Sequence, residues 1–405
     1  MILMNMHTPE GLPATPGDMI RTPAELAECC KRLRKEKCFG FDTEFIGENT
    51  YLPIVCLIQV STATQVDLID PIAVHDLSEL MNLIADPDVL KICHAGDQDL
   101  AIVYQMSKKV PANVMDTQIL AGLVGIGYPL SYGRLVEYLC GITLDKAHTY
   151  SAWDRRPLTK AQFHYAVDDV RYLSRIYTDI SRQFDDLNRR HWAEQACAEL
   201  CKTAGAPPNP QTTYLKIKTP RSMNPMQIAA LRDLAVWREQ AAFEHNIPAR
   251  SFMPDNVLKE IARQLPTKIV NLERIADFPK RELKSYGAFI IHLIDKIKAA
   301  SPQTYPELEP ALNDFPDTRR FGDAMWAAAQ AICLGQSVCT SLVASQNEIQ
   351  LLADHIAAGQ SLDKHPFFTG WRYECLGKKL LDFAQGRIAL KLKCCNNRMT
   401  TQTNS

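Results

Sequence analysis

The chain has 405 residues, of which 46% are hydrophobic and 22% are charged, and its formal net charge is −1. This composition is typical of a globular protein, and the length predicts two or three domains. No apolar run approaches the roughly 18 residues that a membrane-spanning helix needs, and the first residues lack the basic and apolar regions of a signal peptide, so we expect a cytoplasmic protein without membrane contacts.

The first half of the chain predicts a mixed α/β domain. Residues 1–20 contain Pro and Gly without periodicity and predict a flexible tail. Thr22 followed by Pro23 predicts the start of a helix. β-rich runs at about 38–45, 54–60 and 65–70 predict three consecutive antiparallel strands. Further expected elements are a helix at 75–85, a strand at 91–95, and helices at 97–106, 116–124, 131–140 and from 159 onward.

The second half of the chain predicts two helical domains. A Pro-rich segment at 205–210 predicts a linker, after which the apolar periodicity becomes helical. A second boundary falls at 301–306, and the polar end of the chain is expected to fray. The expected organisation is a tail at 1–20, an α/β domain at 21–205, helical domains at 211–300 and 306–390, and a tail at 391–405.

The charges are distributed unevenly along the chain. Residues 1–200 contain 19 Lys and Arg against 27 Asp and Glu, a net charge of −8. Residues 201–300 contain 16 against 9, a net charge of +7, and residues 301–405 are balanced. A polyanion-binding module beside a cation-loaded site would produce this asymmetry, and so would drift in composition. Both interpretations stay open.

Two carboxylates lie two positions apart in the apolar run 39–45. In an extended strand, Asp42 and Glu44 share one face of the sheet, whereas the alternate positions point to the other face. Their repulsion and partial desolvation must be offset by a divalent cation, by a basic partner or by solvent. Alone, this pattern is more typical of solvated or salt-bridged acids than of metal ligands.

Further acidic residues have structural explanations of their own. Asp97 and Asp99 lie between a predicted strand and a predicted helix, where loops often place functional groups. Asp116 is explained as a helix N-cap. Tyr165 and Asp169 are one helical turn apart and therefore share a face, as on an ordinary half-exposed helix.

Taken in order, these acids resemble the three exonuclease motifs of the DEDD superfamily, in its tyrosine-containing branch. The motifs are Asp42-x-Glu44, His94-Ala-x-x-x-Asp99 and Tyr165-x-x-x-Asp169. The intervening sequence is similar to the ribonuclease D family over about residues 20–200. The similar segments are Cys56-Leu-Ile-Gln59, Leu68-Ile-Asp-Pro71, Met115-Asp-Thr-Gln118, Leu144-Asp-Lys146 and Trp153-x-x-Arg156-Pro-Leu158.

The resemblance implies a ribonuclease-H-like exonuclease domain, a mixed sheet flanked by helices, that uses two divalent ions. Asp42, Glu44 and Asp169 would hold one ion, and Asp42 would bridge to a second ion that Asp99 holds through water. Oxygen-only ligands suit Mg²⁺ or Mn²⁺. The thirteen cysteines include no Cys-x-x-Cys, which favours neither zinc nor a disulfide framework. Tyr165 would orient the attacking water together with Glu44.

The resemblance also separates competing residues. Asp99 is preferred over Asp97 because it matches the family spacing from His94, and Asp97 is then expected to cap the helix. Tyr165 is preferred over His164, whose position five residues before Asp169 points it away from that carboxylate. Histidines that end a buried strand are more often hydrogen-bonded to backbone than catalytic. Possible substrate contacts are Thr43, Phe45, Gln59, His94 and Arg156.

The helical segments resemble known modules as well. Leu231-x-x-Leu234-x-x-Trp237-Arg238, followed by Asn246-Ile-Pro248 and Leu258-x-x-Ile261-Ala262, is similar to the HRDC domain, which follows ribonuclease D and RecQ-type helicase cores. Trp237 at this spacing is expected in the core. Residues 342–381, with Gly370-Trp-Arg372, resemble the second HRDC-like domain of bacterial ribonuclease D.

The resemblance implies a 3′→5′ exoribonuclease that releases 5′-mononucleotides from RNA with a single-stranded 3′ end, with tRNA precursors as the implied substrate. We expect a monomer. Two alternatives are a nucleic-acid-binding scaffold with an inactive nuclease site and a DNA-directed exonuclease. The four carboxylates and Tyr165 argue against the first alternative, and the two helical appendages argue against the second.

Overall fold

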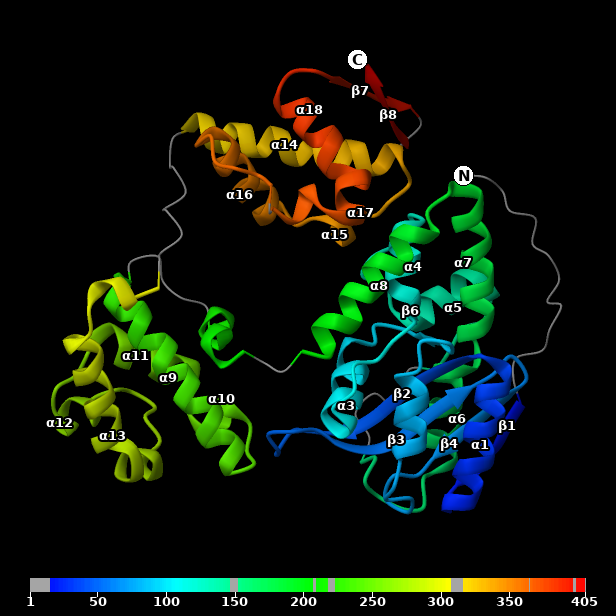
Figure 1. Cartoon of the computed structure of the whole chain (residues 1–405), viewed down its shortest axis with the longest axis horizontal. Coiled ribbons are helices and arrows are strands. Elements are labelled where there is room, and N and C mark those ends of the chain that lie inside the picture. Colours follow the sequence, from blue (N-terminus) through cyan, green and yellow to red (C-terminus); the bar gives the residue numbers. More distant parts are fainter. Residues whose placement is uncertain are drawn as a thin grey trace. The chain divides into compact units, whose positions relative to one another are not determined.

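The protein is described here by a computed structural model that defines residues 15–145, 152–206, 209–217, 223–306, 316–363, 365–395 and 398–404 (Figure 1). Contacts divide the chain into two compact units. One unit comprises residues 1–44, 55–206 and 312–405, and the other comprises residues 45–54 and 207–311. Residues 1–14 of the expected N-terminal tail and Lys146 of the family-like segments lie outside the described residues.

A six-stranded mixed sheet forms the centre of the first unit. Its spatial order is β1-β4-β3-β2-β5-β6. β3 and β4 pair in antiparallel orientation, whereas β1 with β4, β2 with β5 and β5 with β6 pair in parallel. The expected α/β fold class is confirmed. The strands are β1 Thr15–Ile20, β2 Cys38–Ile46, β3 Ile54–Ser61, β4 Gln65–Ile69, β5 Leu90–Cys93 and β6 Val114–Asp116.

Two strands differ from the sequence expectation. Residues 15–20, expected to belong to a tail, form β1 and pair with β4 from Thr15 opposite Gln65 to Ile20 opposite Ile69, with an irregularity between Pro16 and Met19. Backbone pairing holds this segment, so it needs no apolar periodicity of its own. β6 was not expected either, because its three residues are too few to show an alternating pattern.

The expected helices of the α/β domain are confirmed with small shifts of their ends. Thr22 caps the first helix in a capping box: its side chain accepts from Glu25 N, and Glu25 accepts from Thr22 N at 2.9 Å. The helices are α1 Pro23–Glu36, α2 Ser78–Ile84, α3 Asp97–Ser107, α4 Thr117–Leu123, α5 Tyr132–Cys140, α6 Lys160–Arg171, α7 Leu173–Leu187 and α8 Arg190–Ala204.

The two faces of β2 meet different surroundings. Phe39 and Phe41 are fully buried in the hydrophobic core to which α1, α2 and α3 contribute. Gly40 points to the opposite face, where a Cβ at this position would lie 2.9 Å from the Leu173 side chain at the start of α7. Asp42 and Glu44 therefore follow Gly40 on the face away from α1–α3, as the period of two predicts.

The C-terminal helices belong to the first unit and share a core with it. Buried side chains of α4, α7 and α8 form one cluster with those of α14, α16 and α18. Trp192 Nε1 in α8 donates to Glu374 at 2.8 Å, and Arg372 is paired with Glu199 at 2.6 Å. The elements are α14 Pro316–Gly335, α15 Thr340–Val343, α16 Gln346–Ala357, η3 Pro366–Phe368, α17 Gly370–Arg372, η4 Tyr373–Gly377 and α18 Lys378–Ala384.

The expected C-terminal tail is partly structured. β7, Ala389–Cys395, and β8, Arg398–Asn404, pair antiparallel from Ala389 opposite Asn404 to Cys395 opposite Arg398. The polar composition of this segment predicted fraying, but a hairpin gains its regular structure from backbone hydrogen bonds rather than from an apolar pattern. The expectation of a loose segment at 391–405 is therefore wrong for the described part of the hairpin.

The second unit is helical and has its own core. Its elements are η1 Pro210–Lys216, α9 Pro225–Glu244, α10 Ala249–Phe252, α11 Asp255–Gln264, α12 Ile269–Leu272, α13 Lys280–Ala299 and η2 Pro302–Thr304. Trp237, expected in the core, is partly buried and packs against it, with its ring 5.6 Å from Phe252 and 5.4 Å from Tyr286. Among the described helices, none has the length and apolar character to cross a bilayer.

Candidate active site

Three carboxylates from two elements converge on the face of β2 that points away from α1–α3. Asp42 and Glu44 come from β2, and Asp169 comes from α6. One oxygen atom from each lies within 4.8 Å of the others, and all three side chains are partly buried. Oxygen atoms at these separations can share one cation, so the sequence pattern and the tertiary structure agree on a candidate metal site.

A fourth carboxylate, Asp99, lies in the first turn of α3 and is 7% exposed. The Thr43 hydroxyl, which is also buried, donates a hydrogen bond to Asp99 Oδ1. Asp97 is exposed to solvent, and Gly96, not Asp97, occupies the N-cap position of α3. Asp99 is close enough to Asp42, Glu44 and Asp169 to repel their charges. The expectation that Asp97 caps the helix is wrong.

The four carboxyl groups resist ionisation together. Burial, followed by repulsion from Asp99, Asp169 and Glu44, raises the pKa of Asp42 well above its usual value. Burial and repulsion from Asp169 and Asp99 raise the pKa of Glu44 to about 9. Burial is also the main cause that raises the pKa of Asp99 to about 6 and that of Asp169 to about 7. Cations would remove this repulsion and hold the carboxylates ionised.

Tyr165 lies one turn before Asp169 on α6 and donates a side-chain hydrogen bond to it, which opposes the rise in the pKa of Asp169. Its ring lies 6.0 Å from that of Trp153, which is 2% exposed. His164 is exposed and packs edge-on against Phe163. The structure therefore brings Tyr165, and not His164, to the carboxylates.

Comparisons with known proteins agree with this geometry. Residues 18–185 match a family model described as 3′-5′ exonuclease, and residues 227–294 match the HRDC domain. The chain is 32% identical to ribonuclease D of Gluconacetobacter diazotrophicus, over 92% of this chain and 94% of that protein. It is 31% identical to ribonuclease D of Sphingobium indicum, over 94% of this chain and 98% of that protein. The chain belongs to the ribonuclease D family.

A solved structure gives the same result at the level of the fold. Escherichia coli ribonuclease D, described as an exoribonuclease involved in structured RNA processing, superposes with a TM-score of 0.81 at 27% identity and covers 91% of this chain and 98% of that chain. This ribonuclease D family member is accordingly a hydrolytic 3′→5′ exoribonuclease that acts on RNA. The exonuclease domain and the group of carboxylates support dependence on a divalent metal.

His94 and Asp116 fix the turn before Asp99 in this ribonuclease D family member. His94 uses both ring nitrogens, Nδ1 with Thr117 Oγ1 and Nε2 with Leu130 O, each at 2.9 Å. Asp116 caps α4, as expected, and also accepts from the backbone N–H groups of Ala95 at 3.1 Å and Gly96 at 2.8 Å. Sequence reasoning missed this second role, because Ala95 and Gly96 are 21 and 20 positions away from Asp116.

Arg156 has a structural role that differs from the expected substrate contact. Its guanidinium binds Asp70 through Nε at 2.8 Å and Nη2 at 2.7 Å, and it also donates to the carbonyl groups of Cys56 and Trp153. Every guanidinium nitrogen therefore has a partner within the protein. Arg156 attaches the segment that carries Trp153 to β3 and to the end of β4.

The other expected substrate contacts lie at different depths. Thr43 is 6% exposed and is engaged by Asp99, and Gln59 is 0% exposed. Neither side chain is open to RNA, which corrects the expectation for both residues. Phe45, near the end of β2, is partly exposed and remains a candidate for a substrate contact.

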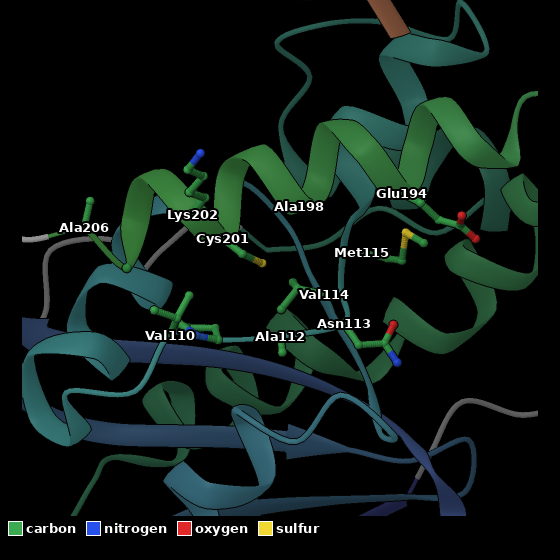
Figure 2. Close-up of a pocket in the computed structure, with 12 residues that line it drawn as sticks. Val110, Ala112, Asn113, Val114, Met115, Glu194, Ala198, Cys201, Lys202 and Ala206 are labelled. Carbon is green, nitrogen blue, oxygen red and sulfur yellow. The ribbon is translucent and has the colours of Figure 1, made fainter. Parts of the chain in front are cut away.

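A separate cleft of about 550 Å³ lies between α8 and the segment 110–115. Figure 2 shows Cys201 pointing from α8 toward Val114, whereas Lys202 points away from it. The lining is mainly apolar and includes Val110, Val114 and Ala198. None of the carboxylates described above lines this cleft, so it is not part of the candidate active site.

Proposed function

We propose that the protein hydrolyses RNA from the 3′ end with two divalent ions and releases 5′-mononucleotides. The observation that supports this proposal most directly is the meeting of Asp42, Glu44 and Asp169, with Asp99 near enough to repel them. The metal-free fold opposes the ionisation of all four groups. Buried acids of one sign at a single place are explained most simply by cations that bind there.

The donor set fits Mg²⁺ or Mn²⁺. The oxygen atoms of Asp42, Glu44 and Asp169 are within 4.8 Å of one another, and no thiol or imidazole belongs to that group of described residues. Hard cations prefer such ligands. We assign one ion to these three carboxylates and a second to Asp42 and Asp99. When bound, the ions would activate water and stabilise charge on the attacking and leaving oxygens.

The protein's own groups would orient the reaction. The Tyr165 hydroxyl already donates a hydrogen bond to Asp169. From this position the Tyr165 hydroxyl can align the attacking water together with Glu44. Asp116 and His94 hold the turn that fixes Asp99, and they do not need to touch the substrate.

The proposed substrate is RNA with a single-stranded 3′ end, in particular a tRNA precursor, processed in the cytoplasm by a monomer. The charge pattern supports separate roles for two parts of the chain, cation binding and attraction of RNA. Residues 1–200 carry a net charge of −8 and would hold the cations, whereas residues 201–300 carry +7 and would attract the phosphate backbone.

The test uses a tRNA precursor with a 3′ trailer, 5′-labelled in one reaction and 3′-labelled in another, together with DNA of the trailer sequence. We expect stepwise shortening of the 5′-labelled RNA in Mg²⁺, release of the 3′ label as a 5′-mononucleotide, and no shortening with Asp42→Asn. RNA binding without hydrolysis by the wild-type protein would favour the inactive scaffold, and faster shortening of DNA would favour the DNA-directed enzyme.

A further inference from the structure

The side-chain amide of Gln59, near the middle of β3, is buried and unpaired within the described part of the chain. It is 0% exposed, and neither its Nε2 nor its Oε1 has a hydrogen-bond partner among the residues that the structure describes. Each buried polar group that stays unpaired costs roughly 1–3 kcal/mol. Such groups are rare in native proteins and call for a specific explanation.

The strand register places Gln59 beside Asp42. β2 and β3 are neighbours in the sheet, and their connection, residues 47–53, is too short for a parallel crossover, so they run antiparallel. A Cβ at Gly40 would lie 2.6 Å from Ser61 Oγ, which identifies Gly40 and Ser61 as facing residues. Two residues further along each strand, Asp42 faces Gln59 on the same side of the sheet.

Helix α6 covers this side of the sheet. Ser61 Oγ donates to the Val170 carbonyl oxygen of α6 at 2.8 Å. Asp169 precedes Val170, and Tyr165 lies one turn earlier on the same helix. The amide of Gln59 therefore lies in the floor of the carboxylate site, under the helix that carries Asp169, and it is too deep to touch RNA.

We propose that Gln59 is a positioning residue for the metal site and that its Nε2 donates a hydrogen bond to the Asp42 carboxylate when cations are bound. A carboxylate that holds a cation still has lone pairs that need donors, and such outer partners fix its orientation. The inference rests on the proposed function, because it requires that Asp42 holds a cation. It also explains why an amide, and not an aliphatic side chain, occupies a fully buried strand position.

The test compares Gln59→Met with Ser61→Ala. Met has nearly the length and volume of Gln but no donor. We expect metal-free Gln59→Met to melt at or above the wild-type temperature, because two unpaired groups are removed, and to bind Mn²⁺ 10- to 100-fold more weakly in calorimetry. Its kcat should fall at limiting Mg²⁺ and recover at high Mg²⁺, with KM for RNA unchanged. Ser61→Ala should lower the melting temperature and leave Mn²⁺ affinity unchanged.

Several results would overturn the inference. Wild-type Mn²⁺ affinity in Gln59→Met, or in Gln59→Leu if the first variant does not fold, would show that Gln59 only fills space. A metal-free Gln59→Met protein that melts well below wild type would show that the amide already has a structural partner. If the wild-type protein itself binds no Mn²⁺, the proposed function fails, and the two failures can therefore be distinguished.

Discussion

Replacement of Asp169 by Asn removes a carboxyl group whose ionisation the metal-free fold opposes, and it changes the shape of the side chain very little. Burial, repulsion from Asp168 and Asp99, and the opposing hydrogen bond from Tyr165 leave the pKa of Asp169 at about 7, against an ordinary value of 3.8. The folded protein therefore keeps a proton that the unfolded chain has lost. Its free energy of unfolding falls as the pH rises from about 4 through about 7.

The size of the effect follows from the shift. One pKa unit corresponds to about 1.4 kcal/mol, so between pH 5 and pH 8 this group lowers the stability of the metal-free wild type by about 3 kcal/mol. This is an upper value, because the neighbouring carboxyl groups share the repulsion. Asp169→Asn lacks the penalty, so its stability relative to wild type should increase by up to about 3 kcal/mol over that interval.

The assay is urea unfolding in EDTA at pH 5, 6, 7 and 8. Asp97→Asn is the matched control, because Asp97 is exposed and lies outside the group of three carboxylates. Asp169→Asn should gain stability with pH relative to wild type, the control should not, and only Asp169→Asn should abolish hydrolysis in Mg²⁺. A stability difference that does not change with pH would refute the electrostatic account of the site.

Other side chains of the site and of the helical unit give four further predictions. Asp99→Asn should reduce hydrolysis severely and Asp97→Asn only mildly in a Mg²⁺-dependent RNA assay. The reverse order would show that Asp97, and not Asp99, acts in the site. Tyr165→Phe should lower kcat roughly 10- to 1000-fold with little change in RNA affinity. An unchanged kcat in Tyr165→Phe together with a lowered kcat in His164→Ala would contradict the role of the tyrosine. Arg156→Ala should destabilise the fold by about 3–5 kcal/mol, because it leaves Asp70, whose side chain is 3% exposed, without its partner. If urea unfolding gives this variant the stability of the wild type, the Arg156–Asp70 pair contributes little. Lys280, Arg281 and Lys284 are all exposed on α13, and their replacement by Gln should weaken the salt dependence of RNA binding. The slope of log affinity against log salt concentration should become shallower by roughly 0.7 for each RNA phosphate that these side chains neutralise in the wild type. An unchanged slope would place the phosphate-binding residues elsewhere.

Local periodicity predicted the parts of the site that lie within one element. The two-residue repeat of a strand was enough to place Asp42 and Glu44 on one face, and the four-residue spacing of a helix was enough to pair Tyr165 with Asp169. Joining these elements needs tertiary structure, which a single sequence does not display. The resemblance to a family supplied that step, and the structure brings the segments together.

Interactions between distant residues explain most of what the sequence did not reveal. Arg156 and Asp70 are 86 positions apart, and no local sequence pattern indicates that they form a bidentate ion pair. Asp97 was expected to cap α3, but Ala95 adopts a positive φ of 53° and Asp116 takes the N–H of Gly96, so the helix begins without a side-chain cap of its own. Both outcomes depend on which segments the sheet brings side by side.

The acidic site also links the stability of this protein to cation binding. Asp42 and Glu44 are held together by a strand whose other face, with Phe39 and Phe41, is fully buried in the core, so the fold supplies the energy that keeps the repelling groups in place. A cation that binds only the folded chain stabilises it, by about 2.7 kcal/mol when the free cation concentration is one hundred times the dissociation constant. The metal-free protein should therefore unfold more easily at high pH, and a saturating divalent cation should reduce that pH dependence because it replaces the retained protons as the partner of the carboxylates.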